Sequence, residues 1–225
     1  MIQQYILPIL AVVIGLLVSI VTDHKRNYLS KLLLSFSGSF LLALTLFDLL
    51  PEVYEHLETK QTGVFIMAGI LLQVVLEFFS KGAEHGHIHI HHDETKFPWL
   101  LFLSLCIHSF LEGFPIHHHN DMVYGVMVHK IPIAMLITTY LLSSNFSKQK
   151  CIFFLTVFGL MTPLGTLISN QMDIALTYIY YINAIVIGIF FHISTTILFE
   201  SSEGHKFNIS KLTAIILGFI IAYSI

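Results

Sequence analysis

Long apolar runs alternate with short polar segments along the whole chain. Each run has roughly 17 to 22 residues, which is enough for a helix to cross the ~30 Å hydrocarbon core of a bilayer. The pattern predicts eight spanning helices, at residues 5–22, 31–50, 63–79, 97–116, 122–142, 151–170, 178–199 and 209–225. The first run lacks a basic leader and a small-residue cleavage site, so we expect it to stay in the protein as a helix.

The composition excludes an ordinary soluble domain. Hydrophobic residues make up 55% of the 225 residues and charged residues only 11%, whereas soluble domains average about 25% charged residues. The polar segments between the runs are too short to fold separately. We therefore predict an all-α membrane protein, a single transmembrane domain at 1–225 within a lipid bilayer, and no nucleic-acid partner.

The basic residues between the runs lie almost entirely on one side of the predicted bundle. That side holds nine of the eleven: Lys25, Arg26, Lys31, Lys81, Lys96, Lys148, Lys150, Lys206 and Lys211. Lys60 falls on the other side, and Lys130 lies inside a run. Because lysine and arginine are enriched on the cytoplasmic side of membranes, we expect both termini on the non-cytoplasmic side.

Polar residues interrupt two neighbouring runs near their middle. His108 and Glu112 are four positions apart, so a helix places them on one face. His129 and Lys130 lie at a similar depth in the next, antiparallel run. Ionisable groups in hydrocarbon cost several kcal/mol unless they are paired, hydrated or bound to an ion. Two imidazoles and a carboxylate suit zinc or a similar divalent ion, so we predict a metal site of His108, Glu112 and His129.

Two more polar residues in the runs are candidates for metal contact. Asp48 lies at the outer end of the second run, where it would either attract cations to an entrance or simply face water. His192 lies in the seventh run. It is a further candidate ligand, although a single histidine in a spanning helix often only bonds to a neighbouring helix.

The predicted cytoplasmic loop at 80–97 carries a tract of alternating histidines. The candidate ligands in it are His87, His89 and His91. Such a tract either binds metal loosely or is a polar linker, and the sequence leaves both readings open.

With these residues the chain resembles the Zrt/Irt-like (ZIP) family of divalent metal transporters over most of its length. The fourth-helix pattern of that family is matched by His108, Ser109, Glu112 and Gly113. The fifth-helix pattern is matched by His129, Lys130 and Pro132. The Leu-Leu-Pro-Glu ending of the family's second helix appears at Leu49–Glu52.

The resemblance implies a transporter that moves zinc, or iron, manganese or cadmium, into the cytoplasm by alternating access across the plasma (inner) membrane. The metal is then the cargo, and no catalytic cofactor is implied. Ser109 becomes a further candidate ligand, and a homodimer stays open. Similar segments in the second and seventh runs, which cross in opposite directions, also favour an inverted repeat of helices 1–3 and 6–8 around helices 4–5.

The chain departs from the family where many members hold a second metal ion. Those members have an acid directly after the fifth-helix histidine and another His or Glu one turn later. Here the two positions hold Lys130 and Ile133. Ser109 stands where Asn is common, and Asp48 stands where a His often precedes the Leu-Leu-Pro-Glu string. We therefore expect one metal ion, with the charge of Lys130 in place of the second.

An intramembrane zinc-dependent hydrolase is the alternative function, because three protein ligands and an open position on zinc also suit catalysis. The sequence has no His-Glu-x-x-His motif and no second carboxylate placed as a general base. A haem between His108 and His129 would leave Glu112 unexplained. The sequence thus favours a transporter and not an enzyme.

Overall fold

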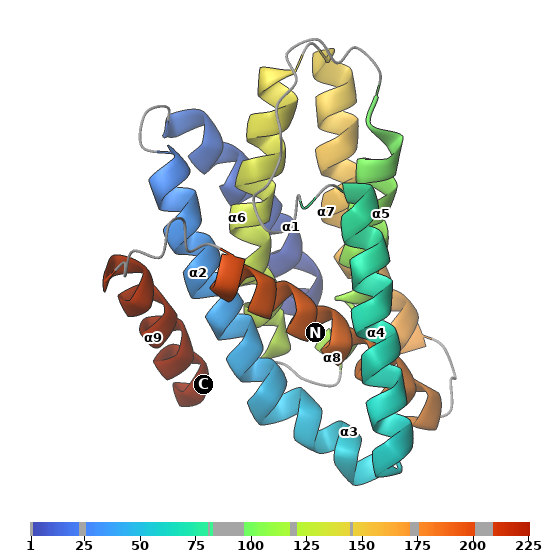
Figure 1. Ribbon diagram of the computed structural model, residues 1–225. Coiled ribbons are helices and arrows are strands. Elements are labelled where there is room, and N and C mark those ends of the chain that lie inside the picture. Colours follow the sequence, from blue (N-terminus) through green and yellow to red (C-terminus); the bar gives the residue numbers. More distant parts are fainter. Residues whose placement is uncertain are drawn as a thin grey trace.

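The computed structural model describes residues 2–22, 26–80, 82, 97–117, 121–144, 146–171, 176–200 and 209–225. The secondary structure in these ranges is helical throughout (Figure 1). Its α-helices are α1 (Ile2–Val21), α2 (Arg26–Leu44), α3 (Leu50–His56), α4 (Thr59–Ser80), α5 (Trp99–Leu111), α6 (Met122–Ser143), α7 (Lys148–Gln171), α8 (Leu176–Glu200) and α9 (Ile209–Ser224). The predicted histidine ligands of the loop, His87, His89 and His91, lie outside the described residues.

The second predicted run forms one long rod, because α2 continues through a π-helix at Thr45–Leu49 directly into α3. The eight predicted runs therefore correspond to eight helical segments of the described chain, and the all-helical fold is confirmed. Six of these segments are long and apolar enough to cross a membrane. The other two, α5 and α9, are apolar but shorter.

The fourth predicted helix, 97–116, is wrong in its last part. The α-helix ends at Leu111, and a turn leads into a 3-10 helix at Pro115–His117. Gly113 weakens the helix at this point, and Pro115 has no N–H to continue it. Phe114 and Ile116 of the irregular segment are buried. Non-helical backbone at membrane depth is tolerated only where protein or a polar cavity surrounds it.

The helices pack as two groups. One group consists of α1, α5, α6 and α7, and the other of α2, α3, α4, α8 and α9. The two groups are not separate bodies, because α2 packs along α6 more extensively than along α8 of its own group, and α4 contacts α5. All residues of the predicted metal site proper, on α5 and α6, belong to the first group.

Glycines allow the closest helix pairs to approach backbone to backbone. The pairs are α1 with α6 at Gly15, α5 with α7 at Gly165, α4 with α8 at Gly69, and α2 with α9 at Gly218. A Cβ atom on any of these glycines would meet a backbone carbonyl oxygen of the partner helix. Small residues are the usual device for close helix packing in membranes. An inverted repeat that exchanges spans 1–3 with spans 6–8 would relate the α1–α6 pair to the α7–α5 pair, and the α4–α8 pair to the α9–α2 pair. The repeat itself stays a prediction.

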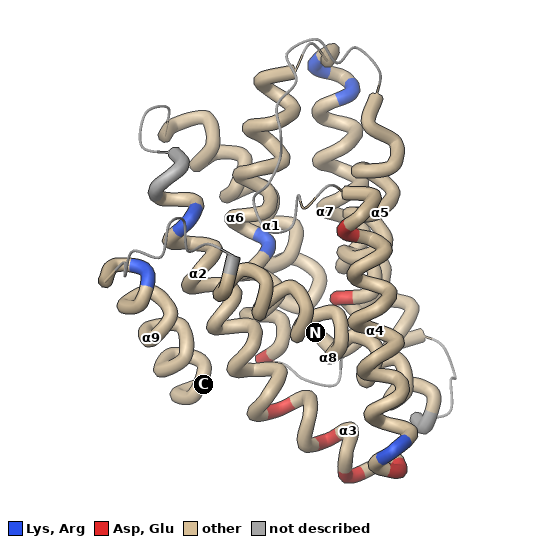
Figure 2. The backbone as a smooth tube through the Cα atoms, in the orientation of Figure 1, with Lys and Arg blue, Asp and Glu red and all other residues tan. Residues whose placement is uncertain are grey.

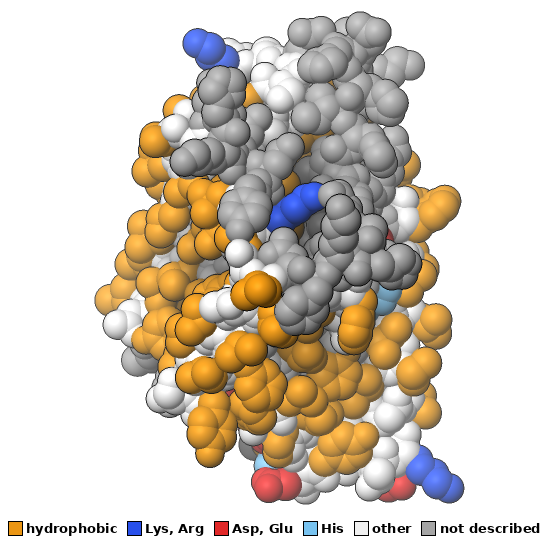
Figure 3. Space-filling view, turned by 60° about the vertical axis from the view of Figure 1, so that its left-hand side comes forward, with side chains coloured by type: hydrophobic (Ala, Val, Ile, Leu, Met, Phe, Trp, Pro, Cys, Tyr) orange, Lys and Arg blue, Asp and Glu red, His pale blue; other side chains and the backbone are white. Residues whose placement is uncertain are grey.

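The sides of the bundle are apolar and its ends are charged. Large hydrophobic side chains are exposed on most helices and cover much of the face in Figure 3. The lysine-rich end has Lys31, Lys148, Lys150 and Lys211 near the starts of α2, α7 and α9. The other end carries Glu52 and Glu55 on α3 and Lys60 at the start of α4 (Figure 2). This distribution fits a bundle with lipid around its sides and water at its ends.

Candidate metal centre

Two neighbouring helices bring four ionisable side chains together inside the bundle. His108 lies in the last turn of α5, and Glu112 is the residue that caps the C-terminal end of that helix. His129 and Lys130 lie in the first half of α6. All four side chains are at most 3% exposed, so the cluster is closed to both lipid and water.

The imidazole of His108 faces the carboxylate, as the sequence spacing predicts. His108 Nε2 lies 3.5 Å from Glu112 Oε2, while no hydrogen-bond partner for His108 Nδ1 is found among the described residues. The His108 and His129 rings have centroids 6.2 Å apart and planes at 84°. Two imidazoles that share a tetrahedral zinc ion have centroids about 5 Å apart. A shared ion therefore requires a small approach of the two rings.

The arrangement is not yet a closed coordination shell. Within the described part of the chain, no group of three or more His, Cys, Asp or Glu side chains is close enough to hold a metal ion as it stands. The predicted three-ligand set is thus brought to one place, but its members are not drawn around a common point.

Lys130 holds the other oxygen of the carboxylate. Its Nζ donates hydrogen bonds to Glu112 Oε1, to Ser109 Oγ and, at 2.8 Å, to Thr162 Oγ1. An ammonium group has three N–H donors, so all of them are used. Nζ also lies 4.4 Å from the centre of the Phe158 ring, a cation–π distance. A buried lysine is stable under such conditions because its charge and its donors are both satisfied.

Thr162 of α7 is a further member of this cluster, which the sequence did not predict. Its hydroxyl lies 2.6 Å from Glu112 Oε1 and 3.0 Å from the carbonyl oxygen of Ser109. The only signal in the sequence is its position directly before Pro163 in an apolar run. The candidate ligand Ser109 likewise contacts Lys130 and the Glu112 carboxylate, at 3.2 Å from the latter.

A reciprocal pair of glycines brings Thr162 within reach of the carboxylate. A Cβ on Gly113 would overlap the carbonyl oxygen of Thr162, and a Cβ on Gly165 would overlap that of Phe110. The backbones of α7 and of the α5 end therefore touch at this point, and only glycine permits this approach. Thr166 secures it with a hydrogen bond of 2.9 Å from its hydroxyl to the carbonyl oxygen of Gly113.

The structure places the other two candidates on the second helix group. Asp48 is a half-buried residue of the π-helix at Thr45–Leu49, and π-turns are frequent at functional sites. His192 of α8 lies with its Nε2 2.5 Å from Glu77 Oε2 of α4. It also faces a cavity of about 380 Å³ between α2, α4 and α8. Neither residue joins the cluster around Glu112.

Comparison with known proteins gives one matching family and two relatives. The family model described as ZIP Zinc transporter matches residues 84–225. Zinc transporter ZIP1 of Danio rerio is 30% identical over 87 residues, which are 36% of this chain and 29% of that protein. Protein zntD of Dictyostelium discoideum is 28% identical over 107 residues, 40% of this chain and 16% of that protein. The chain thus spans less than a third of the length of the curated relatives that it matches.

Proposed function

The chain belongs to the ZIP zinc transporter family, and from this premise we propose that it carries divalent metal ions, zinc above all, across the membrane into the cytoplasm. The family consists of transporters and not of enzymes, and its members are multi-pass integral membrane proteins. The metal is the substrate of this process.

The observation that carries the proposal is the buried pair of His108 and Glu112 facing His129. The three side chains offer two imidazole nitrogens and one carboxylate oxygen, a set that suits zinc. They lie where α5 breaks off inside the bundle, and broken helices at mid-depth are typical of substrate sites in transporters. In this proposal, Glu112 Oε2 and the two imidazoles bind the ion.

The proposed site holds one ion. Glu112 Oε1 is engaged by the Lys130 ammonium, so only one carboxylate oxygen is left for metal. A second divalent cation on the Oε1 side of the carboxylate would lie next to the Lys130 ammonium, and the two like charges would repel each other in a medium of low dielectric constant. Metal analysis of the protein without residues 84–93 should find close to one zinc ion per chain, and two tightly held ions would contradict this.

Transport through this site requires movement, because the cluster is closed to both sides in the present structure. The cluster residues on α5, α6 and α7 all belong to one helix group. We expect that group to shift relative to the second group, at the contacts of α2 with α6 and of α4 with α5. Asp48 and the acidic residues of α3 would raise the local cation concentration at the entrance.

The test is metal uptake into proteoliposomes by the purified protein, with zinc, iron and manganese in competition. We expect zinc uptake to fall more than tenfold in His108→Ala and in His129→Ala, because even the loss of a residue behind a metal ligand lowers metal affinity by ~10–100-fold. The exposed His56 of α3, which bonds to the carbonyl oxygen of Glu52, supplies the control His56→Ala.

Undiminished uptake in both His108→Ala and His129→Ala would disprove the site. Two results would instead support the alternative of an intramembrane hydrolase. One is metal uptake that requires an organic substrate. The other is zinc-dependent hydrolysis by a wild-type protein that takes up no metal.

A further inference from the structure

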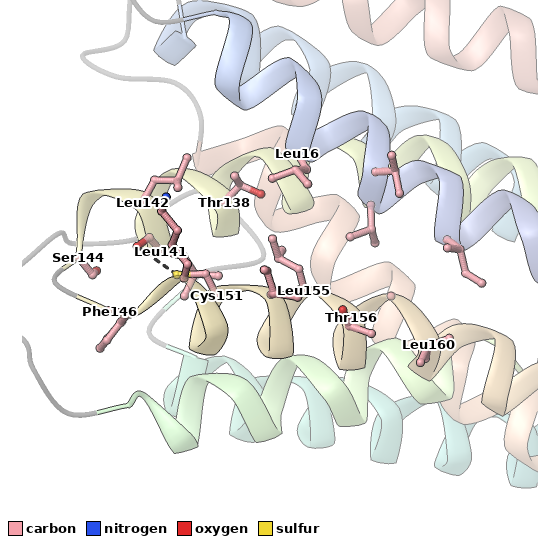
Figure 4. A pocket seen from close by; sticks show the side chains of 16 residues that line it. Leu16, Thr138, Leu141, Leu142, Ser144, Phe146, Cys151, Leu155, Thr156 and Leu160 are labelled. Carbon is pink, nitrogen blue, oxygen red and sulfur yellow. Dashed lines mark hydrogen bonds between the residues drawn. The ribbon is translucent and has the colours of Figure 1, made fainter.

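A lipid-facing groove runs between α1, α6 and α7, apart from the metal centre. It is a cavity of about 620 Å³. In Figure 4, Leu16 of α1, Leu142 of α6 and Leu155 of α7 point into the same space. Side chains along its edges are strongly exposed: 42% for Val13, 58% for Leu142, 65% for Ile152 and 48% for Leu160. The groove therefore opens sideways, toward the lipid.

The groove is about as long as one leaflet is deep. Its wall on α7 extends from Lys148 to Leu160, and twelve residues of α-helix rise by ~18 Å. Half of the hydrocarbon core measures ~15 Å. The groove thus begins at the lysine-rich end of the bundle and reaches the middle of the membrane.

Among the described residues that line the groove, positive charge lies at one end. Lys148, the first residue of α7, lines that end together with Ser144 and Phe146. The start of a long helix also carries a partial positive charge, which favours a phosphate. In this turn the N–H of Lys150 already donates to Ser147 Oγ, so the lysine and the helix charge carry the attraction. Toward mid-membrane the lining is mainly aliphatic, with Ile9 and Val12 of α1 and Leu160 of α7. An apolar slot with a cationic end is complementary to one molecule type, a lipid with an anionic headgroup.

We propose that this groove binds an anionic phospholipid of the leaflet at the lysine-rich end, with an acyl chain in the slot and the headgroup phosphate against Lys148 and the start of α7. Basic pockets between spanning helices are known to select anionic lipids. The site shares no residue with the metal cluster, so the proposal stands or falls independently of metal transport.

Two positions allow the groove to be changed without disturbing the helix packing. Lys148 and Lys150 are both exposed in the first turn of α7, but only Lys148 lines the groove. Gly159 lies at the deep end, and a Cβ there would meet Val12 no closer than 3.6 Å. A Cβ therefore fits at position 159 without a clash, and we expect the longer side chain of a leucine there to extend past Val12 and occupy the deep part of the slot.

The experiment is a titration of the full-length purified protein in detergent with phosphatidylglycerol and, separately, phosphatidylcholine, followed by native mass spectrometry. We expect the wild-type protein and Lys150→Gln to bind phosphatidylglycerol about fivefold more tightly than phosphatidylcholine, the effect of one interfacial lysine. Lys148→Gln should lose this preference. Gly159→Leu should lose binding of both lipids while its helix content by circular dichroism stays unchanged.

Three outcomes would overturn the proposal: no headgroup preference in the wild-type protein, equal behaviour of Lys148→Gln and Lys150→Gln, or full lipid binding by folded Gly159→Leu. If Gly159→Leu does not fold, the two lysine variants still decide, because both changes lie in an exposed helix turn.

Discussion

A lysine ammonium beside a carboxylate is stable inside a membrane protein only while each group keeps its partner. Lys130→Met would leave the Glu112 carboxylate buried without its cation, and Glu112→Gln would leave the Lys130 ammonium without its anion. Each change should lower the free energy of unfolding by ~3–5 kcal/mol. The double variant Glu112→Gln/Lys130→Met should lose clearly less than the sum, because neither charge is then left alone.

The measurement is denaturant unfolding of the metal-free protein in detergent micelles. Lys60→Met, a change at an exposed lysine in the first turn of α4, is the control and should shift the unfolding free energy by less than ~0.5 kcal/mol. Strictly additive losses in the double variant would show that the pair does not stabilise the fold.

The charged members of this cluster could be predicted from the sequence, and its hydroxyl members could not. A histidine, a glutamate or a lysine in an apolar run is conspicuous because lipid penalises it. A threonine is not, because its hydroxyl can bond to a carbonyl within its own helix, as Thr45 and Thr139 do here. Thr162 therefore looked like an ordinary helix residue. The hydrogen bond from Lys130 to Thr162 forms only because α5 and α7 pack closely. The pattern of residues along one helix does not indicate how closely two helices pack.

The sequence predicts where helices occur along the chain, but it indicates only some of the places where a helix breaks or changes its winding. Gly113 and Pro115 signal the break after α5, yet the apolar run continues past them and predicts a helix to residue 116. The π-helix at Thr45–Leu49 has no comparable signal, since an extra residue in one turn leaves the overall hydropathy unchanged. The sequence also does not show which helices pack against each other. Contacts such as that of Gly69 with Ile185 join residues that are far apart in the sequence.

The crossing of α5 and α7 should tolerate no side chain at its centre. Gly165→Ala places a Cβ against the carbonyl oxygen of Phe110, so the two helices must separate and Thr162 must withdraw from Glu112. We expect a loss of ~1–3 kcal/mol in the free energy of unfolding, as for other overpacked interiors, and slower zinc uptake.

The matched control for this glycine is Gly63→Ala in α4, where a Cβ would meet nothing within 4 Å. Alanine favours a helix by up to ~1 kcal/mol over glycine, so this variant should be as stable as the wild type or more so. Denaturant unfolding and proteoliposome uptake of both variants provide the comparison. Equal stability of Gly165→Ala and Gly63→Ala would mean that the α5–α7 contact is looser than described.

At the scale of the whole molecule, the charges at the two ends predict the orientation in the membrane. Four of the six described lysines lie near the starts of α2, α7 and α9, at Lys31, Lys148, Lys150 and Lys211. Lys130 is buried in α6, and only Lys60 of the six lies at the opposite end, near Glu52 and Glu55. By the positive-inside rule, the lysine-rich end should face the cytoplasm and both termini should face away from it. Protease-cleavable tags at each terminus should be cut from the non-cytoplasmic side of intact cells.

The control for orientation is the same cleavable tag placed in the loop between α6 and α7, next to Lys148, which should be cut only after the cells are opened. Protection of both terminal tags in intact cells would reverse the assignment. It would also reverse the direction in which the acidic end of α3 could gather cations, and with it the proposed import.

The ion pair of Glu112 and Lys130 also has a consequence for how the chain is made. A ribosome delivers Glu112 to the translocon before Lys130, and Thr162 after both. A lysine near the centre of a helix raises the apparent free energy of membrane insertion by ~2.5–3.5 kcal/mol. The carboxylate at the end of α5 is already present when α6 partitions into the bilayer, and its attraction for the ammonium offsets that penalty. We therefore expect the same two charges that close one side of the metal centre in the finished protein to assist the membrane insertion of α6.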